Sequence, residues 1–506
     1  MKLRAFLIGL AALLWSALPS QAQAPSKSAL ANTLNQCIYP NSSGAVTPQC
    51  VNSFLQVLLS AMCGLGQASD CPLVTIPLDP RQFGAKCDGS NGPNYDTTAL
   101  QAWAAAATNP AGNRMTLPSG CIVNGTITIS NPFVLTGGDL GLQDSGAAYA
   151  TLAQVSPTAN TFNITTSQAW AISHIGIRAA VTRTNGADIW VAGDGVNIPT
   201  GFVIDGVGFN GSFTCISIPK GTAWKIVNST CRNYGYGGSG DAIYYPSTGA
   251  TDTADNAIIG NNFVSGVSGT TDYGYAALYL ESAQGLFVQG NKFFGAQFGI
   301  ELQAKNGSGN LIVNGNSFEQ QLYSHIDVAQ NTGSGSFGNL IVTNNEFSDL
   351  STVTPPVSAS RPTVYIDAGL SAAYGTNVVV ANNVFNDLYT TSVPSLAVFD
   401  GVGVNVRGNV FNLYSQTGPS SIQVGGYASG VVLGDNIFNG QTSAQHYRYV
   451  SGTATMIRDL GLHFADLSNW ANGSEVYCVD CTPGSTLTGN GSGAWGRRIN
   501  GAWVGN

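Results

Sequence analysis

Gly315-Asn316-Ser317-Phe318 is one of seven copies of a four-residue unit, in which a small residue or Asn precedes Asn, a variable residue and Phe. Successive Phe residues of the copies are 30, 25, 29, 38, 26 and 27 residues apart. The other six copies are Gly260-Asn261-Asn262-Phe263, Gly290-Asn291-Lys292-Phe293, Asn344-Asn345-Glu346-Phe347, Asn382-Asn383-Val384-Phe385, Gly408-Asn409-Val410-Phe411 and Asp435-Asn436-Ile437-Phe438.

A short β-branched run, such as Leu311-Ile312-Val313, precedes most copies, and another strand-like run follows about ten residues later. Two or three short strands in each period of 25 to 30 residues are typical of one turn of a parallel β-helix. Stacked turns place each Asn about 4.8 Å above the previous one, where the amides form a hydrogen-bonded ladder. The Phe rings stack inside the coil. We therefore predict an all-β fold, a right-handed parallel β-helix (solenoid).

The chain divides into four predicted parts. Residues 1–24 resemble a signal peptide, with a basic start, an apolar stretch from Ala5 to Leu18, and cleavage after Ala22 or Ala24. A cysteine-containing extension (25–75), the β-helix (76–445) and a small C-terminal β segment with a C-x-x-C (446–506) follow. Since no second apolar run has membrane length, we expect a secreted or periplasmic protein without a membrane span.

Charge and cysteine content narrow the partners. A formal net charge of -8 argues against a nucleic acid partner. Ten cysteines in an exported chain indicate disulfides rather than metal ligands, and we predict no metal site. The pairs predicted from proximity are Cys37 with Cys50, Cys63 with Cys71, Cys87 with Cys121, Cys215 with Cys231, and Cys478 with Cys481.

The segment before the repeats carries a second pattern. Asp79-Pro80-Arg81-Gln82-Phe83-Gly84-Ala85-Lys86-Cys87-Asp88-Gly89 is followed by Asp96-Thr97-Thr98-Ala99-Leu100-Gln101 and by Leu117-Pro118-Ser119-Gly120. This resembles the N-terminal part of the pectin-lyase-like β-helix superfamily. Tyr95 and Ile122 depart from the superfamily's pattern. We expect a capping helix from Thr97 to Ala107 that starts at an Asp96 cap and closes the end of the coil stack.

The resemblance is specific for architecture and uninformative about chemistry. The superfamily includes pectate and pectin lyases, polygalacturonases, other glycosidases, epimerases and bacteriophage tailspikes. The polygalacturonase motifs are not found as a set, and Gly240-Asp241 is a fragment of one of them. The resemblance implies a polysaccharide partner and either a monomer or a tailspike-like homotrimer.

Aligning the strand-like runs by their apolar positions places outward side chains in rows about 4.8 Å apart. One row holds Tyr279, Glu301, Asp327, Tyr365 and Gln423, and its neighbour holds Glu281, Gln303, Asp367 and Asp400. Close carboxylates keep one another partly protonated, and a pair near 5 Å suits retaining glycoside hydrolysis. We predict Glu301 and Asp327 as the acid and the nucleophile or base, supported by Asp367 and Glu281. The predicted substrate-binding residues are Tyr244, Tyr245, Tyr279, Tyr365 and Asp400.

Two other functions fit the same residues. A lyase would use the carboxylates to bind Ca²⁺ and a Lys or Arg to take the proton beside a uronate, but the aligned strands carry no basic residue. A hydrolase of this kind needs no cofactor. The third hypothesis is a non-catalytic, glycan-binding or adhesin-like rod, since acidic residues also keep an exposed sheet soluble.

Overall fold

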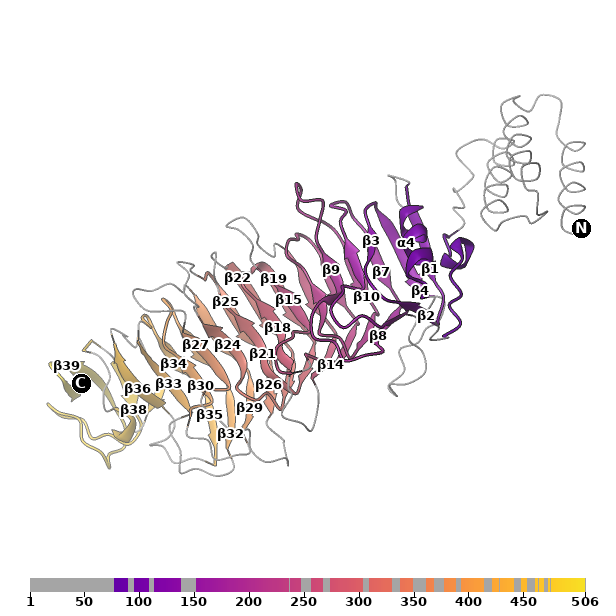
Figure 1. Ribbon diagram of the computed structural model, residues 1–506. Helices are drawn as coiled ribbons and strands as arrows, with labels where there is room; N and C mark the ends of the chain where they lie inside the picture. The colour runs from indigo at the N-terminus through magenta and orange to yellow at the C-terminus, as the bar shows by residue number, and fades with distance from the viewer. Residues whose placement is uncertain are drawn as a thin grey trace, which may run out of the picture.

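Three parallel sheets of twelve strands each, wound as a coil, form the body of the protein in a computed structural model (Figure 1). The structure describes residues 77–89, 95–108, 113–137, 152–235, 237–246, 256–266, 274–303, 309–329, 337–348, 361–367, 377–387, 393–413, 421–426, 428–440, 447–452, 460–462, 464–467, 472–473 and 475–505. The predicted signal peptide and the extension up to residue 75 lie outside these residues.

Each turn of the coil gives one strand to each sheet. Sheet A contains β1 (Asn113–Leu117), β4 (Phe133–Gly137), β7 (Ala171–Ser173), β10 (Val203–Asp205), β13 (Lys225–Val227), β16 (Ile258–Gly260), β19 (Gln284–Gln289), β22 (Gly309–Asn314), β25 (Leu340–Thr343), β28 (Val378–Ala381), β31 (Asn405–Arg407) and β34 (Val432–Gly434). Sheet B contains β2 (Cys121–Val123), β5 (Leu152–Gln154), β8 (Gly176–Ala179), β11 (Gly208–Asn210), β14 (Thr230–Tyr234), β17 (Phe263–Gly266), β20 (Lys292–Phe294), β23 (Ser317–Glu319), β26 (Glu346–Ser348), β29 (Val384–Asp387), β32 (Val410–Leu413) and β35 (Ile437–Asn439). Sheet C contains β3 (Ile127–Ile129), β6 (Phe162–Ile164), β9 (Ala187–Val191), β12 (Thr214–Ser217), β15 (Ile243–Tyr245), β18 (Gly274–Leu280), β21 (Ala296–Leu302), β24 (Ser324–Ala329), β27 (Val364–Asp367), β30 (Leu396–Val398), β33 (Ile422–Gly426) and β36 (Tyr447–Gly452).

The Asn of each repeat forms the predicted ladder at the turn between sheets A and B. Asn291 is representative: its Oδ1 accepts from the backbone N and Nδ2 of Asn262, at 2.9 and 3.0 Å. Its Nδ2 donates to Asn316 Oδ1 at 2.9 Å and to the Ile259 carbonyl at 3.0 Å. The residue before each ladder Asn has φ between 54° and 65°, a left-handed conformation that Gly and Asn tolerate. This explains the small residue or Asn that opens the repeat.

The Phe rings stack inside the coil as predicted, from Phe293 to Phe438, with neighbouring centroids 4.6–5.1 Å apart. The copy at 260–263 is an exception, because it is displaced by one residue. Asn262 rather than Asn261 stands in the ladder, and Val264 is the register partner of Phe293. Phe263 instead lies outside the core, where the Arg232 guanidinium is 4.9 Å from its ring centroid.

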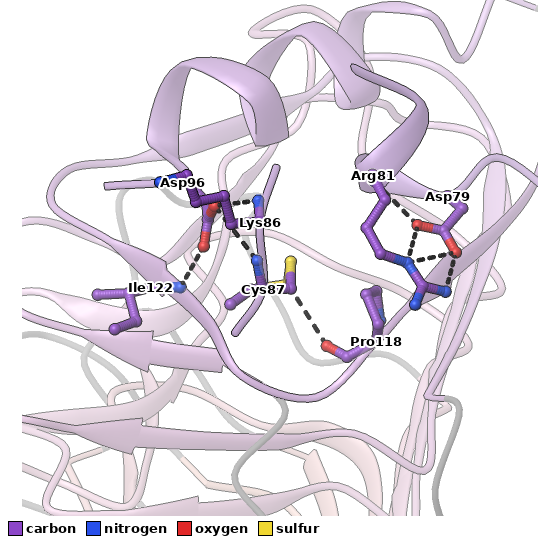
Figure 2. The surroundings of a disulfide bond; sticks show 8 residues. Asp79, Arg81, Lys86, Cys87, Asp96, Pro118 and Ile122 are labelled. Atoms are coloured by element: carbon purple, nitrogen blue, oxygen red, sulfur yellow. Dashed lines mark hydrogen bonds and ion pairs between the residues drawn. A yellow bond between two sulfur atoms is a disulfide. The ribbon is translucent and has the colours of Figure 1, made fainter. Parts of the chain in front are cut away.

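The N-terminal end of the coil is covered by α4 (Thr97–Ala105), preceded by the 3₁₀ helix η1 (Pro80–Phe83). Leu100 and Trp103 are fully buried, and the Trp103 indole donates to the Leu78 carbonyl at 2.8 Å. The helix follows Asp96 as expected, but this carboxylate does not cap it. Asp96 instead accepts from the backbone N–H groups of Lys86 at 2.7 Å and Ile122 at 2.9 Å (Figure 2). The acid of the motif therefore ties the preceding loop to strand β2.

Three of the predicted disulfides form: Cys87–Cys121, Cys215–Cys231 and Cys478–Cys481. The other two predicted pairs, Cys37 with Cys50 and Cys63 with Cys71, lie outside the described residues. Cys231 is the register partner of Phe209 on β11 and of Val264 on β17. A disulfide therefore takes the place of the stacked Phe in that turn.

The C-terminal part forms a separate four-stranded sheet with one parallel and two antiparallel pairings. Its strands are β37 (Leu460–Leu462), β38 (Glu475–Cys478), β39 (Ala494–Ile499) and β40 (Ala502–Gly505), and the 3₁₀ helix η3 (Phe464–Leu467) follows β37. Since β36 pairs with β33, the β-helix extends past the boundary predicted at residue 445. Within the described part of the chain, no helix has both the length and the apolarity needed to cross a membrane.

Candidate functional site

The predicted outward row on sheet C exists, and we call it the first outer row. Its members Tyr244, Tyr279, Glu301, Asp327 and Tyr365 are consecutive register partners on β15, β18, β21, β24 and β27. The row continues through Ala397 on β30 to Gln423 on β33. These strands lie side by side along the middle of the coil (Figure 1).

A second outer row lies two residues further along each strand, and it holds Glu281, Gln303, Ala329 and Asp367. Asp400 does not extend it, contrary to the prediction. The corresponding residue after β30 is Phe399, whose N–H donates to the Ile366 carbonyl at 2.8 Å. Asp400 is the next residue, where the strand has ended, and its side chain is completely buried. It therefore belongs to neither outer row.

Asp327 forms an ion pair with Arg361, which lies just before β27. Burial raises the pKa of Asp327 to about 6, while Arg361 opposes this rise and Glu301 and Asp367 add to it. The guanidinium lies over the rings of Phe298 and Tyr365, 5.7 Å from each centroid. The sequence analysis missed Arg361, because strand alternation gives no information about a residue outside a strand.

Asp241 is a further acid of the cluster that the sequence analysis did not assign. It precedes β15, is almost completely buried, and accepts from the Ala276 N–H at 3.1 Å. Burial raises the pKa of Asp241 well above its usual value, and the charges of Glu301 and Glu281 add to this effect. The fragment Gly240-Asp241 was the one signal in the sequence that pointed to it.

Two buried oxygens in this cluster have no hydrogen-bond partner, Gln303 Oε1 and Asp327 Oδ1, whereas the Tyr275 hydroxyl hydrogen-bonds to the Glu301 carboxyl group. The exposed fractions of Glu301, Gln303 and Asp327 are 5%, 5% and 0%. Gln303 Nε2 donates to Glu301 Oε1 at 3.0 Å, which fixes the orientation of both side chains. Leaving a buried acceptor without a donor costs roughly 1–3 kcal/mol, and more for a charged group. The arrangement is therefore suited to a ligand that brings hydrogen-bond donors.

Aromatic side chains border the acids on the N-terminal side. Tyr244 and Tyr279 stack with centroids 5.2 Å apart, and Tyr275 meets Tyr279 edge-on at 5.6 Å. The Tyr244 hydroxyl donates to Glu281 Oε1 at 3.2 Å. On the other side, the Tyr365 hydroxyl donates to Asp367 Oδ2 at 2.6 Å. The tyrosines thus both flank and orient the carboxylates.

Tyr245 was predicted to contact substrate, and this prediction is wrong. The side chain of Tyr245 is fully buried, and its ring stacks on Trp224 with centroids 6.3 Å apart. Adjacent residues of a strand point to opposite faces, so only Tyr244 of this pair faces outward. His325, next to the acidic strand in sequence, is also buried, and its ring contacts Phe318 and Phe347 of the core edge-on.

The first outer row also continues toward the N-terminus, through Ser217 on β12 to Trp190 on β9. Trp190 is 36% exposed. Four strand spacings separate it from Glu301, which is about 19 Å at roughly 4.8 Å per strand. An exposed aromatic ring therefore lies on the same face as the acids, at a distance that only an extended ligand would bridge.

Possible metal ligands were also compared by distance. In the described part of the chain, two groups of three ligand atoms lie within 4.8 Å of one another: Cys87, Asp96 and Cys121, and Cys478, Asp480 and Cys481. The cysteines of both groups form disulfides, which removes their thiolates as ligands. Neither group is therefore a suitable metal centre.

Comparison with known proteins gives information about the fold. No family model and no curated protein sequence matches the chain. Among solved structures, DFA-IIIase from Arthrobacter chlorophenolicus in complex with DFA-III is 13% identical, with a TM-score of 0.53 over 75% of this chain and 99% of that chain. The same enzyme without its lid, in complex with GF2, is 14% identical with a TM-score of 0.52 over 75% and 99%.

The A-module of a mannuronan C-5 epimerase from Azotobacter vinelandii is 12% identical, with a TM-score of 0.49 over 75% of this chain and 99% of that chain. These identities are too low to transfer an activity, but the strand topology and the two DFA-IIIase structures agree with the resemblance seen in the N-terminal motif. The chain has the fold of the pectin-lyase-like right-handed parallel β-helices.

Proposed function

We propose that this protein hydrolyses glycosidic bonds of an extracellular polysaccharide on the outer face of sheet C. The observation that carries the proposal is the register pairing of Glu301 with Asp327, both buried, with Asp327 Oδ1 left without a hydrogen-bond partner. Adjacent strands are about 4.8 Å apart, and carboxyl groups about 5–5.5 Å apart suit a retaining mechanism. The solved DFA-IIIase structures, with DFA-III or GF2 bound, are compatible with a saccharide ligand on this fold.

The surroundings suggest a role for each carboxyl group. Asp327 pairs with Arg361, which favours its ionised form, so Asp327 would attack the anomeric carbon as the nucleophile. Glu301 makes no ion pair with any described residue and would protonate the leaving oxygen, then deprotonate the water that releases the sugar. Glu281 and Asp367, each hydrogen-bonded to a tyrosine, would position the substrate. Asp241 would contribute a further hydrogen-bonding group.

Hydrolysis is better supported than lysis. A lyase needs a base that takes the proton beside a uronate, and Arg361 is the basic group that the structure places beside the acids. Asp327 raises the pKa of Arg361 further above its usual value, although burial opposes this. A guanidinium held in this way does not act as a base. If the protein is a lyase instead, we still predict that its activity requires Ca²⁺.

Export is part of the proposal. Three disulfides within the described residues are consistent with an oxidising compartment, where a polysaccharide substrate would be met. The signal peptide at residues 1–24 remains a prediction from the sequence.

The test is incubation of the mature protein with plant and bacterial polysaccharides. Reducing ends and the ultraviolet absorbance of unsaturated uronates are followed together, with Glu301→Gln and Asp327→Asn as variants. The proposal expects reducing ends without the absorbance, lost in both variants. Absorbance that requires Ca²⁺ would indicate a lyase instead. Glycan binding without turnover by the wild-type protein would indicate a non-catalytic rod.

A further inference from the structure

The chemical nature of the substrate can be inferred from the groups that surround Glu301 and Asp327. This step rests on the proposed function and asks which kind of sugar unit the site accepts. The deciding features are the acceptor oxygens without donors, the local balance of charge, and the ion pair of Arg361, the basic side chain that lies beside the acids among the described residues.

Two unpartnered oxygens beside the proposed acid Glu301 are acceptors. Gln303 Oε1 lies directly after β21, and Asp327 Oδ1 lies at the register position of Glu301 on β24. Each side chain is at least nine-tenths buried, so water has little access to it. A ligand that satisfies such oxygens must offer O–H or N–H groups, because another oxygen without a hydrogen would only add repulsion.

The charge of the site is negative. Glu281, Glu301, Asp327 and Asp367 contribute carboxylates over four consecutive strands of sheet C or their ends, whereas β15, β18, β21, β24 and β27 carry no Lys or Arg. A fifth acid, Asp241, is adjacent. A second anion placed among these groups would be repelled through a poorly screened environment.

Arg361 does not relieve this repulsion. Its Nη1 is paired with Asp327, and the guanidinium lies over the rings of Phe298 and Tyr365. The charge of the guanidinium is therefore already balanced by that of Asp327. With Asp327 as its partner, Arg361 serves as the counter-ion of the nucleophile and not as a receptor for a uronate.

We infer that the sugar unit bound at Glu301 and Asp327 is uncharged and hydroxyl-bearing, as in a neutral glucan, galactan or fructan, and not a uronate. Its hydroxyl groups would donate to Gln303 Oε1 and Asp327 Oδ1. Its apolar ring face would pack on Tyr279 or Tyr275, which lie beside the acids.

The experiment measures hydrolysis and binding in parallel, with wild-type protein, on neutral polysaccharides and on polygalacturonate and alginate. The inference expects reducing ends from a neutral polymer, lost in Glu301→Gln, and at least about tenfold weaker calorimetric binding of the uronates. Reducing ends from a uronate polymer, also lost in Glu301→Gln, would overturn the inference and leave the proposed hydrolase intact. Absence of turnover on every polymer would refute the hydrolase, and the binding preference would then decide the inference alone.

A pair of variants tests the electrostatic cause. Asp367→Asn removes one carboxylate near the site. It should reduce the difference in affinity between neutral glycans and uronates, most clearly at low salt. Glu319→Gln makes the same change of charge on β23 of sheet B, where Glu319 pairs with Lys292 at 3.0 Å, and should leave the preference unchanged. Equal binding of uronates and neutral glycans by the wild-type protein, or binding of neither, overturns the inference.

Discussion

Glu301 on β21 and Asp327 on β24 are direct register partners on the outer face of sheet C, although 26 residues separate them in the sequence. The length of one coil turn sets this separation, so each turn brings a new side chain to the same position of the row. The two acids differ in their surroundings: Asp327 pairs with Arg361, and Glu301 accepts from Gln303. A matched pair of carboxyl groups with distinct environments is what acid and nucleophile roles require.

Glu301→Gln should lower kcat by about 100- to 10,000-fold with little change in thermal stability, because the amide keeps the shape and cannot donate the proton. Steady-state kinetics on the substrate identified by the polysaccharide panel measures this effect. Glu319→Gln on β23 is the matched control and should retain full activity. A Glu301→Gln protein with normal kcat would remove Glu301 from the mechanism.

Asp241→Asn separates a supporting role from a catalytic one. Since burial raises the pKa of Asp241 well above its usual value and so favours the neutral acid, the amide of Asn is a close substitute that keeps the capacity to accept from the Ala276 N–H. We expect kcat at pH 7 to stay within about threefold of the wild type, which is less than 1 kcal/mol of activation free energy. A loss as large as that of Glu301→Gln would make Asp241 the general acid.

The pH profile should depend on Arg361. Asp327 must be ionised to act as nucleophile, and its pKa of about 6 predicts that kcat/KM falls as the pH drops below that value. Arg361 lowers the pKa of Asp327, so Arg361→Gln should move this acidic limb upward by about 1–3 pH units. Lys292→Gln, which removes a cation paired with Glu319 on sheet B, should not move it. If the acidic limb of the kcat/KM profile lies at the same pH in Arg361→Gln as in the wild type, a group other than Asp327 determines that limb.

Trp190 should matter only for long substrates. Trp190→Ala should raise KM by about threefold to tenfold for polysaccharides long enough to reach β9, and should leave KM for short oligosaccharides unchanged. Trp495→Ala is the control, since this ring is 38% exposed but belongs to the C-terminal sheet. Equal effects of Trp190→Ala on short and long substrates would contradict an extended binding face.

The Asn ladder should dominate local stability. In Asn345→Ala, the backbone N–H of Asn316 and the Val313 carbonyl lose buried partners, which should cost about 1–3 kcal/mol in the free energy of unfolding. Asn344→Gly is the control, because Asn344 has a φ of 56° and Gly adopts this conformation readily. Denaturant titration measures both. A larger loss in Asn344→Gly than in Asn345→Ala would contradict the ladder as the source of stability.

The sequence by itself determined the repeating part of this protein. Each turn of the coil needs a residue that tolerates positive φ, an amide side chain for the ladder and an apolar ring for the core. The same residue types therefore recur once per turn along the sequence. Strand alternation then placed Tyr279, Glu301, Asp327 and Tyr365 in one row, as the register confirms. The sequence pattern fails in one copy of the repeat. There Val264, and not Phe263, occupies the core position that pairs with Phe293, so the copy is displaced by one residue.

The tertiary structure alone decided which groups meet at the site from outside the strands. Arg361 reaches Asp327 from a segment with no periodicity, and Asp241 reaches the cluster from a connection before β15. The register likewise decided the place of Asp400: Val398 pairs with Ile366, so Phe399 takes the outer position after β30 and Asp400 points to the buried side. Contacts made by the segments between strands depend on the path of the chain in three dimensions. Contacts between stacked strands follow the repeat, which is visible in the sequence.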